Sequence, residues 1–433
     1  MALATAIVAS AVAPAGGAGG SSQDVPVTCE LIYRAAVERA IGQTAGPTKI
    51  RASDEISGAL AAWLVGERTK DERFRAFALG RYDAFLGLKT DHDFHVSRPF
   101  GLLTLRLQRA GTLAGERRAR AIAQARERIA WVLDKRQFDE KYFDCHIALA
   151  DTLAVACLAR SFPDDPPMRA AEIRRAVAAL GRRILETGDL NENASNYASL
   201  GICFFLELAK LEGWLDEVGK SPHFRNMFAR MRDLISPVGS IPEYGDGYFE
   251  HRQVRLDFVL LLEMAARLYN DASFQDAARR FLGTAPQGLD EDQLHRGYML
   301  LDLDPFATMA RSEPMLSGVQ HRRVPGSPAT VVPDKLILRT GSRPGDAMIM
   351  MDLYALGSHR TATCARYSSD GSISERRLLV KFMRAPGLAI GAERVRPTTM
   401  HAPRADGSKH HVCFTAHSRG ALVPGRRMVA AMA

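Results

Sequence analysis

The chain repeats a polar segment ahead of an apolar run: HDFH (residues 92–95), FDCH (143–146), NASNY (193–197) and YGDGYFEH (244–251). Each segment carries a polar ring, and these rings stand 51 residues apart at His95, His146, Tyr197 and Tyr248. A helical unit that recurs at such a period is typical of stacked helical hairpins. Because the rings share one phase of the repeat, we expect them to gather at one end of the stack.

Much of residues 25–285 has apolar side chains three or four positions apart, as amphipathic helices require. The helices expected from this pattern are Ile56–Val65, Phe74–Leu88, Phe100–Leu107, Arg118–Leu133, Ile147–Ala159, Ala170–Leu185, Ala198–Leu211, Phe224–Leu234 and Leu256–Tyr269. Those that follow the polar segments alternate with helices rich in Arg and Glu, which indicate an outer layer. We therefore predict an incomplete (α/α) toroid of helical hairpins over residues 25–285.

The sequence changes character after residue 286. Gly, Pro, Ser and Asp there separate short β-like runs at Lys335–Arg339, Ala347–Tyr354 and Leu378–Met383. We predict a linker over residues 286–323 and an antiparallel, β-sandwich-like domain over residues 324–433, which makes the fold class α+β and multidomain. Because the final residues lack any alternation, we expect this second domain to be truncated.

The composition is that of a globular protein, with 46% hydrophobic and 24% charged residues among 433. No apolar run reaches the roughly 20 residues of a membrane-spanning helix, so we expect no membrane span. The formal net charge of +8 is a mild excess spread along the chain. With no zinc-finger spacing and no basic stripe interleaved with aromatics, we expect no nucleic-acid partner. An acidic polysaccharide or oligosaccharide would suit the same charge.

Residues 1–24 begin with an uncharged core rich in Ala and Val, followed by the small-residue stretch APAG at residues 13–16. Such a core and cleavage site predict a signal peptide, and with it a periplasmic or secreted protein. No Lys or Arg precedes the core, so a disordered arm on a cytoplasmic protein is the alternative. The six cysteines match neither a disulfide framework nor a metal site. Cys157 and Cys203 stand in apolar runs, where a thiol is usually buried.

Three segments, two of which contain polar segments quoted above, carry a resemblance to a known family. NENASNY (191–197) precedes one helix, PEYGDGYFEHR (242–252) follows one repeat later, and YALGSHR (354–360) holds a lone histidine between β-like runs. This layout resembles the heparinase II/III-like and alginate-lyase-like polysaccharide lyases over residues 90–375. The resemblance implies a helical toroid followed by a sheet domain, and β-elimination of a uronic-acid-containing acidic polysaccharide.

The resemblance also implies a role for each matching residue. Asn193 or Asn196 would neutralise the uronate carboxylate, with Asn196 our choice. Tyr248 and His251 would exchange protons with the sugar, and His359 would complete the cleft from the sheet domain. The family's usual tyrosine lies beyond the Asp-Gly turn, where this chain reads HRQVRLDF without a tyrosine.

The chemistry accounts for these residue types. Elimination removes the weakly acidic C5 proton of a 4-linked uronate, which requires donors that neutralise the neighbouring carboxylate. A tyrosine serves as base or acid when nearby cations lower its pKa, and His251, Arg252 and Arg255 follow Tyr248 closely. Tyr244 is the second tyrosine of the same loop. We expect the remaining ring and polar residues to bind substrate, namely His95, His146, Asn193, Tyr197, Tyr244, Arg252 and Arg255.

Each of these residues also has a purely structural interpretation. Asn196 precedes an apolar run and would serve as a helix cap. His95 and His146 would be satisfied histidines at helix starts, and Tyr197 would pack at a repeat junction. The cluster of Asp91, His92, Asp93 and His95 has no second set of ligands, so we expect neither a metal nor a cofactor.

Two other functions remain open. Helical toroids also host glycoside hydrolases, which need two carboxylates across the scissile bond. The candidates are Asp144, Glu192, Glu243 and Asp246, which fall in or beside the polar segments. A non-catalytic protein that binds acidic glycans is the third candidate, because it would need no proton-transfer tyrosine.

Overall fold

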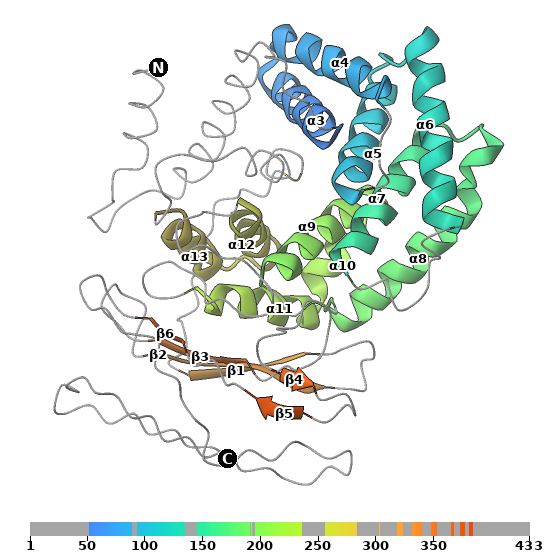
Figure 1. Cartoon of the computed structure of the whole chain (residues 1–433). Coiled ribbons are helices and arrows are strands. Elements are labelled where there is room, and N and C mark those ends of the chain that lie inside the picture. Colours follow the sequence, from blue (N-terminus) through green and yellow to red (C-terminus); the bar gives the residue numbers. More distant parts are fainter. Residues whose placement is uncertain are drawn as a thin grey trace, which may run out of the picture.

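A computed structural model describes most of the helical part and the strands of the sheet. The described residues are 52–88, 93–134, 145–190, 192, 195–235, 256–283, 303, 318–323, 331–339, 348–352, 365–367, 373–376 and 381–383. Helices occupy the first part of the chain and antiparallel strands the second (Figure 1). The coarse prediction of a helical region followed by antiparallel strands is therefore confirmed.

One row of helices consists of elements that contact one another in order along the row. They are α3 (Ala52–Thr69), α5 (Phe94–Arg109), α7 (His146–Ser161), α9 (Ser195–Glu212) and α12 (Leu256–Tyr269). These helices are buried on nearly every side, as the run from Leu149 to Ala159 in α7 illustrates. A helix that is apolar all round belongs to the interior of a larger layered domain.

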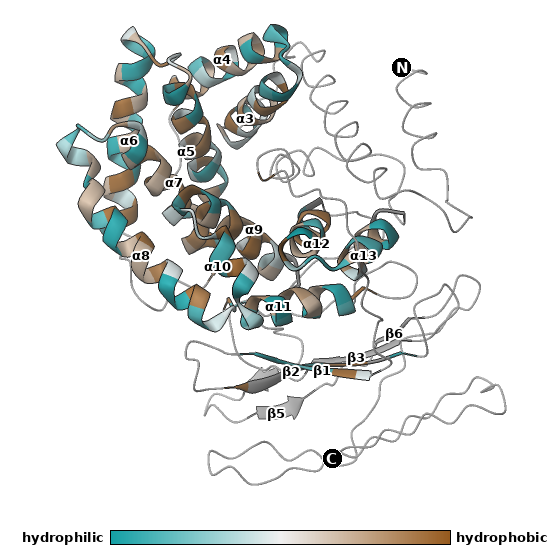
Figure 2. Ribbon diagram, turned by 180° about the vertical axis from the view of Figure 1, so that it is seen from behind, coloured by the Kyte–Doolittle hydropathy of each residue, from teal (hydrophilic) through white to brown (hydrophobic). Residues whose placement is uncertain are grey.

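A second row packs on the first and has one apolar face. Its helices are α4 (Glu72–Leu86), α6 (Gly115–Asp134), α8 (Ala170–Thr187), α11 (Pro222–Asp233) and α13 (Ala272–Gly283), with η1 (Pro166–Met168) and α10 (Leu215–Lys220) as short additions. In α8, Ile173, Val177, Leu180 and Ile184 are buried at helical spacing. The alternation of apolar and polar-faced helices predicted from sequence is visible in Figure 2.

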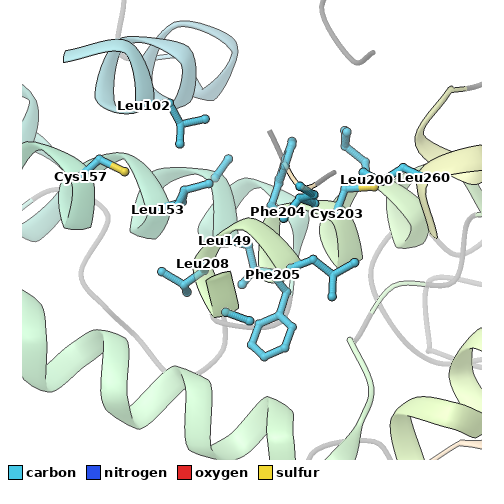
Figure 3. Packing of buried hydrophobic residues seen from close by; sticks show 14 of the residues in the cluster. Leu102, Leu149, Leu153, Cys157, Leu200, Cys203, Phe204, Phe205, Leu208 and Leu260 are labelled. Carbon is cyan, nitrogen blue, oxygen red and sulfur yellow. The ribbon is translucent and has the colours of Figure 1, made fainter. Parts of the chain in front are cut away.

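The 51-residue period recurs in the core. Leu102 of α5, Leu153 of α7 and Phe204 of α9 are 51 positions apart and belong to one buried cluster (Figure 3). Cys157 and Cys203 are buried in the same cluster, as expected from their apolar surroundings. The repeat therefore reflects the packing of successive helices of the first row.

A glycine sets the closest approach between α5 and α7. A Cβ atom at Gly101 would lie 2.7 Å from the carbonyl oxygen of Ala154 and 2.8 Å from its Cα. These are backbone atoms, which cannot rotate away as a side chain would. Any larger residue at position 101 would push the two helices apart.

The polar segments form helix starts. Asp93 caps α5, since its carboxylate accepts the main-chain N–H of His95 at 3.0 Å. Helix α5 therefore begins at Phe94 rather than at the predicted Phe100. In α7 and α9 the first residues are His146 and Ser195. All three ring-bearing segments thus meet their helices within the first turn.

The larger sheet has the antiparallel order β1-β2-β3-β6. Its strands are β1 (Gly318–Arg323), β2 (Val332–Arg339), β3 (Met348–Asp352) and β6 (Lys381–Met383), and a separate pair is formed by β4 (Ala365–Tyr367) and β5 (Ile373–Arg376). Strand β1 lies inside the predicted linker 286–323, so the sheet includes residues ahead of the predicted domain start at 324. The buried residues of β1 are His321 and Arg323, so the strand carries no apolar alternation that would reveal it.

The sheet contacts the helical part along α11 (Figure 1). An ion pair and a histidine–carboxylate contact join the two parts: Arg230 of α11 lies 2.7 Å from Asp334 of β2, and Nε2 of His321 in β1 lies 3.1 Å from Asp233 of α11. All four side chains are buried. Charged groups that are buried in pairs fix the geometry of an interface, because a shifted register would leave them unpaired.

Candidate functional site

The starts of α5 and α7 meet the start of α9 through a group of rings, which we call the ring cluster: Phe94, His95, His146 and Tyr197. The ring of Phe94 meets that of His146 edge-on, with centroids 5.3 Å apart. His146 in turn stacks on Tyr197 at 4.7 Å. His95 lies beside Phe94 at 3.9 Å. The expectation that these polar rings gather at one end of the stack therefore holds for His95, His146 and Tyr197.

The ring cluster runs from the surface into the interior. His95 is exposed, Phe94 and Tyr197 are half-buried, and His146 retains only 2% of its accessible surface. Phe94 was not among the predicted site residues. Its only sequence signal is its place in HDFH, directly before the ring that keeps the repeat.

Glu192 holds the buried histidine of the cluster. One of its oxygens, Oε1, lies 2.9 Å from Nδ1 of His146 and also accepts the main-chain N–H of His146 at 3.0 Å. A carboxylate is an acceptor only, so this contact places a proton on Nδ1. In the neutral ring Nε2 then carries the lone pair and is the hydrogen-bond acceptor.

The packing of α9 leaves room for this pair. Gly201 faces the start of α7, where an added Cβ would lie 3.4 Å from Cα of His146 and 2.8 Å from Cδ1 of Leu190. Leu190 belongs to the turn that leads to Glu192, and Glu192 N–H donates to the Leu190 carbonyl at 2.7 Å. A small residue on α9 thus allows the turn and His146 to approach each other.

A buried ion pair links the helices beneath the ring cluster. Arg98 of α5 meets Oε2 of Glu207 of α9 through Nε at 2.8 Å and Nη2 at 2.7 Å. Its guanidinium lies 4.2 Å from the ring centroid of Phe204. Arg98 occupies the repeat position held by Leu149 and Leu200 in the next helices. A charge at a position that is otherwise apolar is a sequence signal for this pair.

None of the four predicted catalytic residues, Asn196, Tyr248, His251 and His359, has a described side chain. Asn196 is the second residue of α9, in its first turn. The other predicted residues lie outside the described ranges: Asn193, Tyr244, Tyr248, His251, Arg252, Arg255 and His359. Three of the four candidate hydrolase carboxylates, Asp144, Glu243 and Asp246, lie outside them as well.

The acidic and histidine residues ahead of α5 have a structural use. Asp93 is the N-cap of that helix, while Asp91 and His92 fall outside the described residues. Across the part of the chain that is described, no group of three or more His, Cys, Asp or Glu side chains is arranged to hold a metal ion. Within the same part, no helix has the length and apolar character needed to cross a membrane.

No protein-family model matches this chain. No curated protein sequence matches it either. The geometry of the ring cluster and its buried partners is therefore the basis for the function proposed next.

Proposed function

We propose that this chain is a polysaccharide lyase-like protein that cleaves uronic-acid-containing acidic polysaccharide by β-elimination. The observation that carries the proposal is the ring cluster, in which Glu192 fixes the proton of His146 where the starts of α5, α7 and α9 meet. Stacked rings beside a fixed imidazole suit a sugar that offers apolar faces, hydroxyl groups and a carboxylate.

The proposal extends to the architecture. The two rows of helices would belong to an incomplete (α/α) toroid, and the strands to a β-sandwich-like domain. An extended glycan would lie where the helix starts face the sheet domain, since ligands are often held between domains. The proposed location is periplasmic or secreted, where acidic polysaccharides are met.

The reaction assigns one task to each proposed residue. Asn196 donates to the uronate carboxylate, which makes the C5 proton more acidic. A base takes that proton, the electrons form the C4–C5 double bond, and the bond between C4 and its oxygen breaks. An acid returns a proton to the leaving oxygen. Tyr248 and His251 are the proposed proton-transfer pair, with His359 completing the site.

The ring cluster would bind the sugar rather than take the proton. Since Nδ1 of His146 is committed to Glu192, a sugar hydroxyl would meet this ring through Nε2. His95 is exposed, and Tyr197, the residue after Asn196 in the sequence, stacks on His146. The roles proposed for Asn193, Tyr244, Arg252 and Arg255 are further contacts with the acidic chain.

A hydrolase is the weaker alternative because one of its four candidate carboxylates is already engaged. Oε1 of Glu192 is engaged by both the main-chain N–H and Nδ1 of His146, so this carboxylate is committed to holding the helix start rather than to attacking or protonating a glycosidic bond. A hydrolase would have to rely on Asp144, Glu243 or Asp246 instead. A binding protein without catalysis would retain the same ring cluster.

One assay separates the three functions. Purified full-length protein is incubated with a panel of alginate, heparan-type, hyaluronan-like and bacterial exopolysaccharides while the ultraviolet absorbance of the unsaturated uronate is followed. Growth of that absorbance supports the lyase, since only elimination creates the double bond. New reducing ends without absorbance would reject it in favour of a hydrolase. Binding without either product would reject it in favour of a glycan-binding protein.

A further inference from the structure

We infer that Arg323 of β1 is a positioning residue for the His146–Glu192 pair, so that the sheet sets the geometry of a site on the helical part. The inference rests on the proposed function only for its catalytic consequence. Its structural content concerns a buried guanidinium, the turn that carries Glu192, and the proton on Nδ1 of His146.

The guanidinium of Arg323 donates hydrogen bonds to three residues of this turn. Nη2 donates to the carbonyl oxygens of Leu190 at 2.8 Å and Glu192 at 2.6 Å. Nε and Nη2 also meet the two carboxylate oxygens of Asp189, at 2.8 and 3.0 Å. Arg323 is 3% exposed, so these bonds form where water does not compete.

The hydrogen bond from Arg323 to the main-chain carbonyl of Glu192 affects His146 through the side chain of Glu192. Main-chain and side-chain atoms of one residue move together, and Oε1 of Glu192 is the atom that meets both the main-chain N and Nδ1 of His146. Displacing the turn would therefore displace the acceptor that keeps the proton on Nδ1. The proton of His146 would then shift toward Nε2, because the hydrogen bond made by one ring nitrogen decides which nitrogen is protonated.

A second strand reinforces the same turn. Arg230 of α11 lies 3.4 Å from Asp189 and 2.7 Å from Asp334 of β2. The carboxylate of Asp189 thus pairs with two guanidinium groups, those of Arg323 and Arg230, and Arg230 is in turn paired with Asp334 of β2. The turn between α8 and α9 is consequently fixed by the sheet as well as by its own helices.

The test measures the tautomer of His146 in the full chain. Nitrogen-15 NMR of histidine-labelled protein distinguishes Nδ1–H from Nε2–H, and the signal lost in His146→Gln identifies His146. Arg323→Gln removes the charge and most donors, while Arg323→Lys retains a charge with a single ammonium. Arg160→Gln is the matched control, because Arg160 also bridges a carbonyl and a carboxylate, those of Leu211 and Glu212, away from His146.

The wild type is expected to show Nδ1–H, as is Arg160→Gln. Arg323→Gln is expected to populate Nε2–H, with Arg323→Lys between the two. Because His146 is a proposed sugar contact, KM for elimination should rise about tenfold in Arg323→Gln while kcat changes little. An unchanged tautomer in either folded Arg323 variant would overturn the inference, and if Arg323→Gln does not fold, Arg323→Lys decides. A wild-type protein with Nε2–H would overturn it directly, as would an altered tautomer with unchanged KM in a protein that eliminates uronate. A tautomer change in a protein that eliminates no uronate would sustain the positioning and reject the proposed function.

Discussion

Oε1 of Glu192 lies 2.9 Å from Nδ1 of His146, and the two residues are both almost fully buried. The same oxygen accepts the first N–H of α7 at 3.0 Å, so Glu192 is also a cap for that helix, supplied from 46 residues away. One carboxylate therefore fixes a helix end and the imidazole that begins it. Stability and site geometry are coupled at this point.

Removing that carboxylate should be costly. We expect Glu192→Ala to lower the free energy of unfolding by about 2–3 kcal/mol, because a buried N–H and a ring nitrogen lose a charged partner. Glu192→Gln should cost less, since its amide oxygen still accepts. Urea denaturation of both variants gives the comparison. Equal stability of the Ala variant and the wild type would show that the contact is not maintained in solution.

The close crossing of α5 and α7 gives a second prediction. Gly101→Ala should destabilise the protein by about 1–3 kcal/mol, because the new Cβ meets the backbone of Ala154. Gly80→Ala in α4 is the matched control, since no atom lies within 4 Å of its added Cβ. That variant should gain about 0.5–1 kcal/mol from helix propensity alone. Thermal melting of the two proteins should therefore shift in opposite directions, and a shared direction would contradict the packing.

Glu263 of α12 should make stability depend on pH. Burial raises its pKa to about 7 from an ordinary 4.5, against the opposing effects of the Gln275 hydrogen bond and Arg279. Because the folded pKa is the higher one, no penalty exists below pH 4.5, and stability falls as the pH rises from there toward 7. The penalty above pH 7 is about 3 kcal/mol at 1.36 kcal/mol per unit.

Glu263→Gln tests this effect, since it cannot ionise. Its free energy of unfolding should exceed that of the wild type by a margin that widens between pH 4.5 and pH 7. Glu186→Gln on the exposed side of α8 is the control for the loss of one carboxyl group. Parallel stability curves for Glu263→Gln and the wild type would refute the buried, protonated state.

The sheet interface should respond to pH in the opposite sense. Burial alone would raise the pKa of Asp233, but hydrogen bonds and charge from His321 and Arg232 hold it below its ordinary 3.8. Its contribution is therefore present above pH 3.8 and is lost as the pH falls through the lower, folded pKa. Asp233→Asn should cost about 3 kcal/mol at neutral pH, because it leaves buried arginines uncompensated. Unfolding measured from pH 2 to pH 6 should show a shallower acid limb in this variant.

The helical part is largely predictable because its burial is periodic. Helices such as α7 and α9 begin within a few residues of the predicted positions, and His146 and Tyr197 meet as their spacing indicates. The start of α5 is missed because Pro99 interrupts the apolar pattern, although the cap at Asp93 is readable from sequence.

Contacts between distant segments are not predictable in this way. Arg323 and Asp189 are 134 residues apart, and β1 buries charged side chains that resemble a polar loop. Glu192 could be placed near the predicted site as an acidic residue, but its pairing with His146 depends on the turn that only the fold defines. Because both features depend on pairing between residues far apart in the sequence, neither strand β1 nor the contact of Glu192 with His146 is readable from local sequence patterns.

The proposed proton-transfer residues are tested by substitution. Tyr248→Phe should lower the turnover for elimination by about 10²-fold or more without loss of folding, as the removal of a general acid or base does. Asn196→Ala should have a similar effect, and its thermal stability must be measured as well, because loss of a helix cap alone costs about 1 kcal/mol. Full activity in folded Tyr248→Phe would move the role to Tyr244 or Tyr197.

The most direct measurement is the rate at which ultraviolet absorbance of the unsaturated uronate appears with wild-type protein and with His146→Gln. We predict that at least one acidic polysaccharide yields the absorbance with the wild type and that folded His146→Gln is markedly slower, with the loss mainly in KM as befits a substrate contact. No absorbance from any polysaccharide, or an unchanged rate and KM in folded His146→Gln, would contradict the assignment of the ring cluster to a uronate-eliminating site.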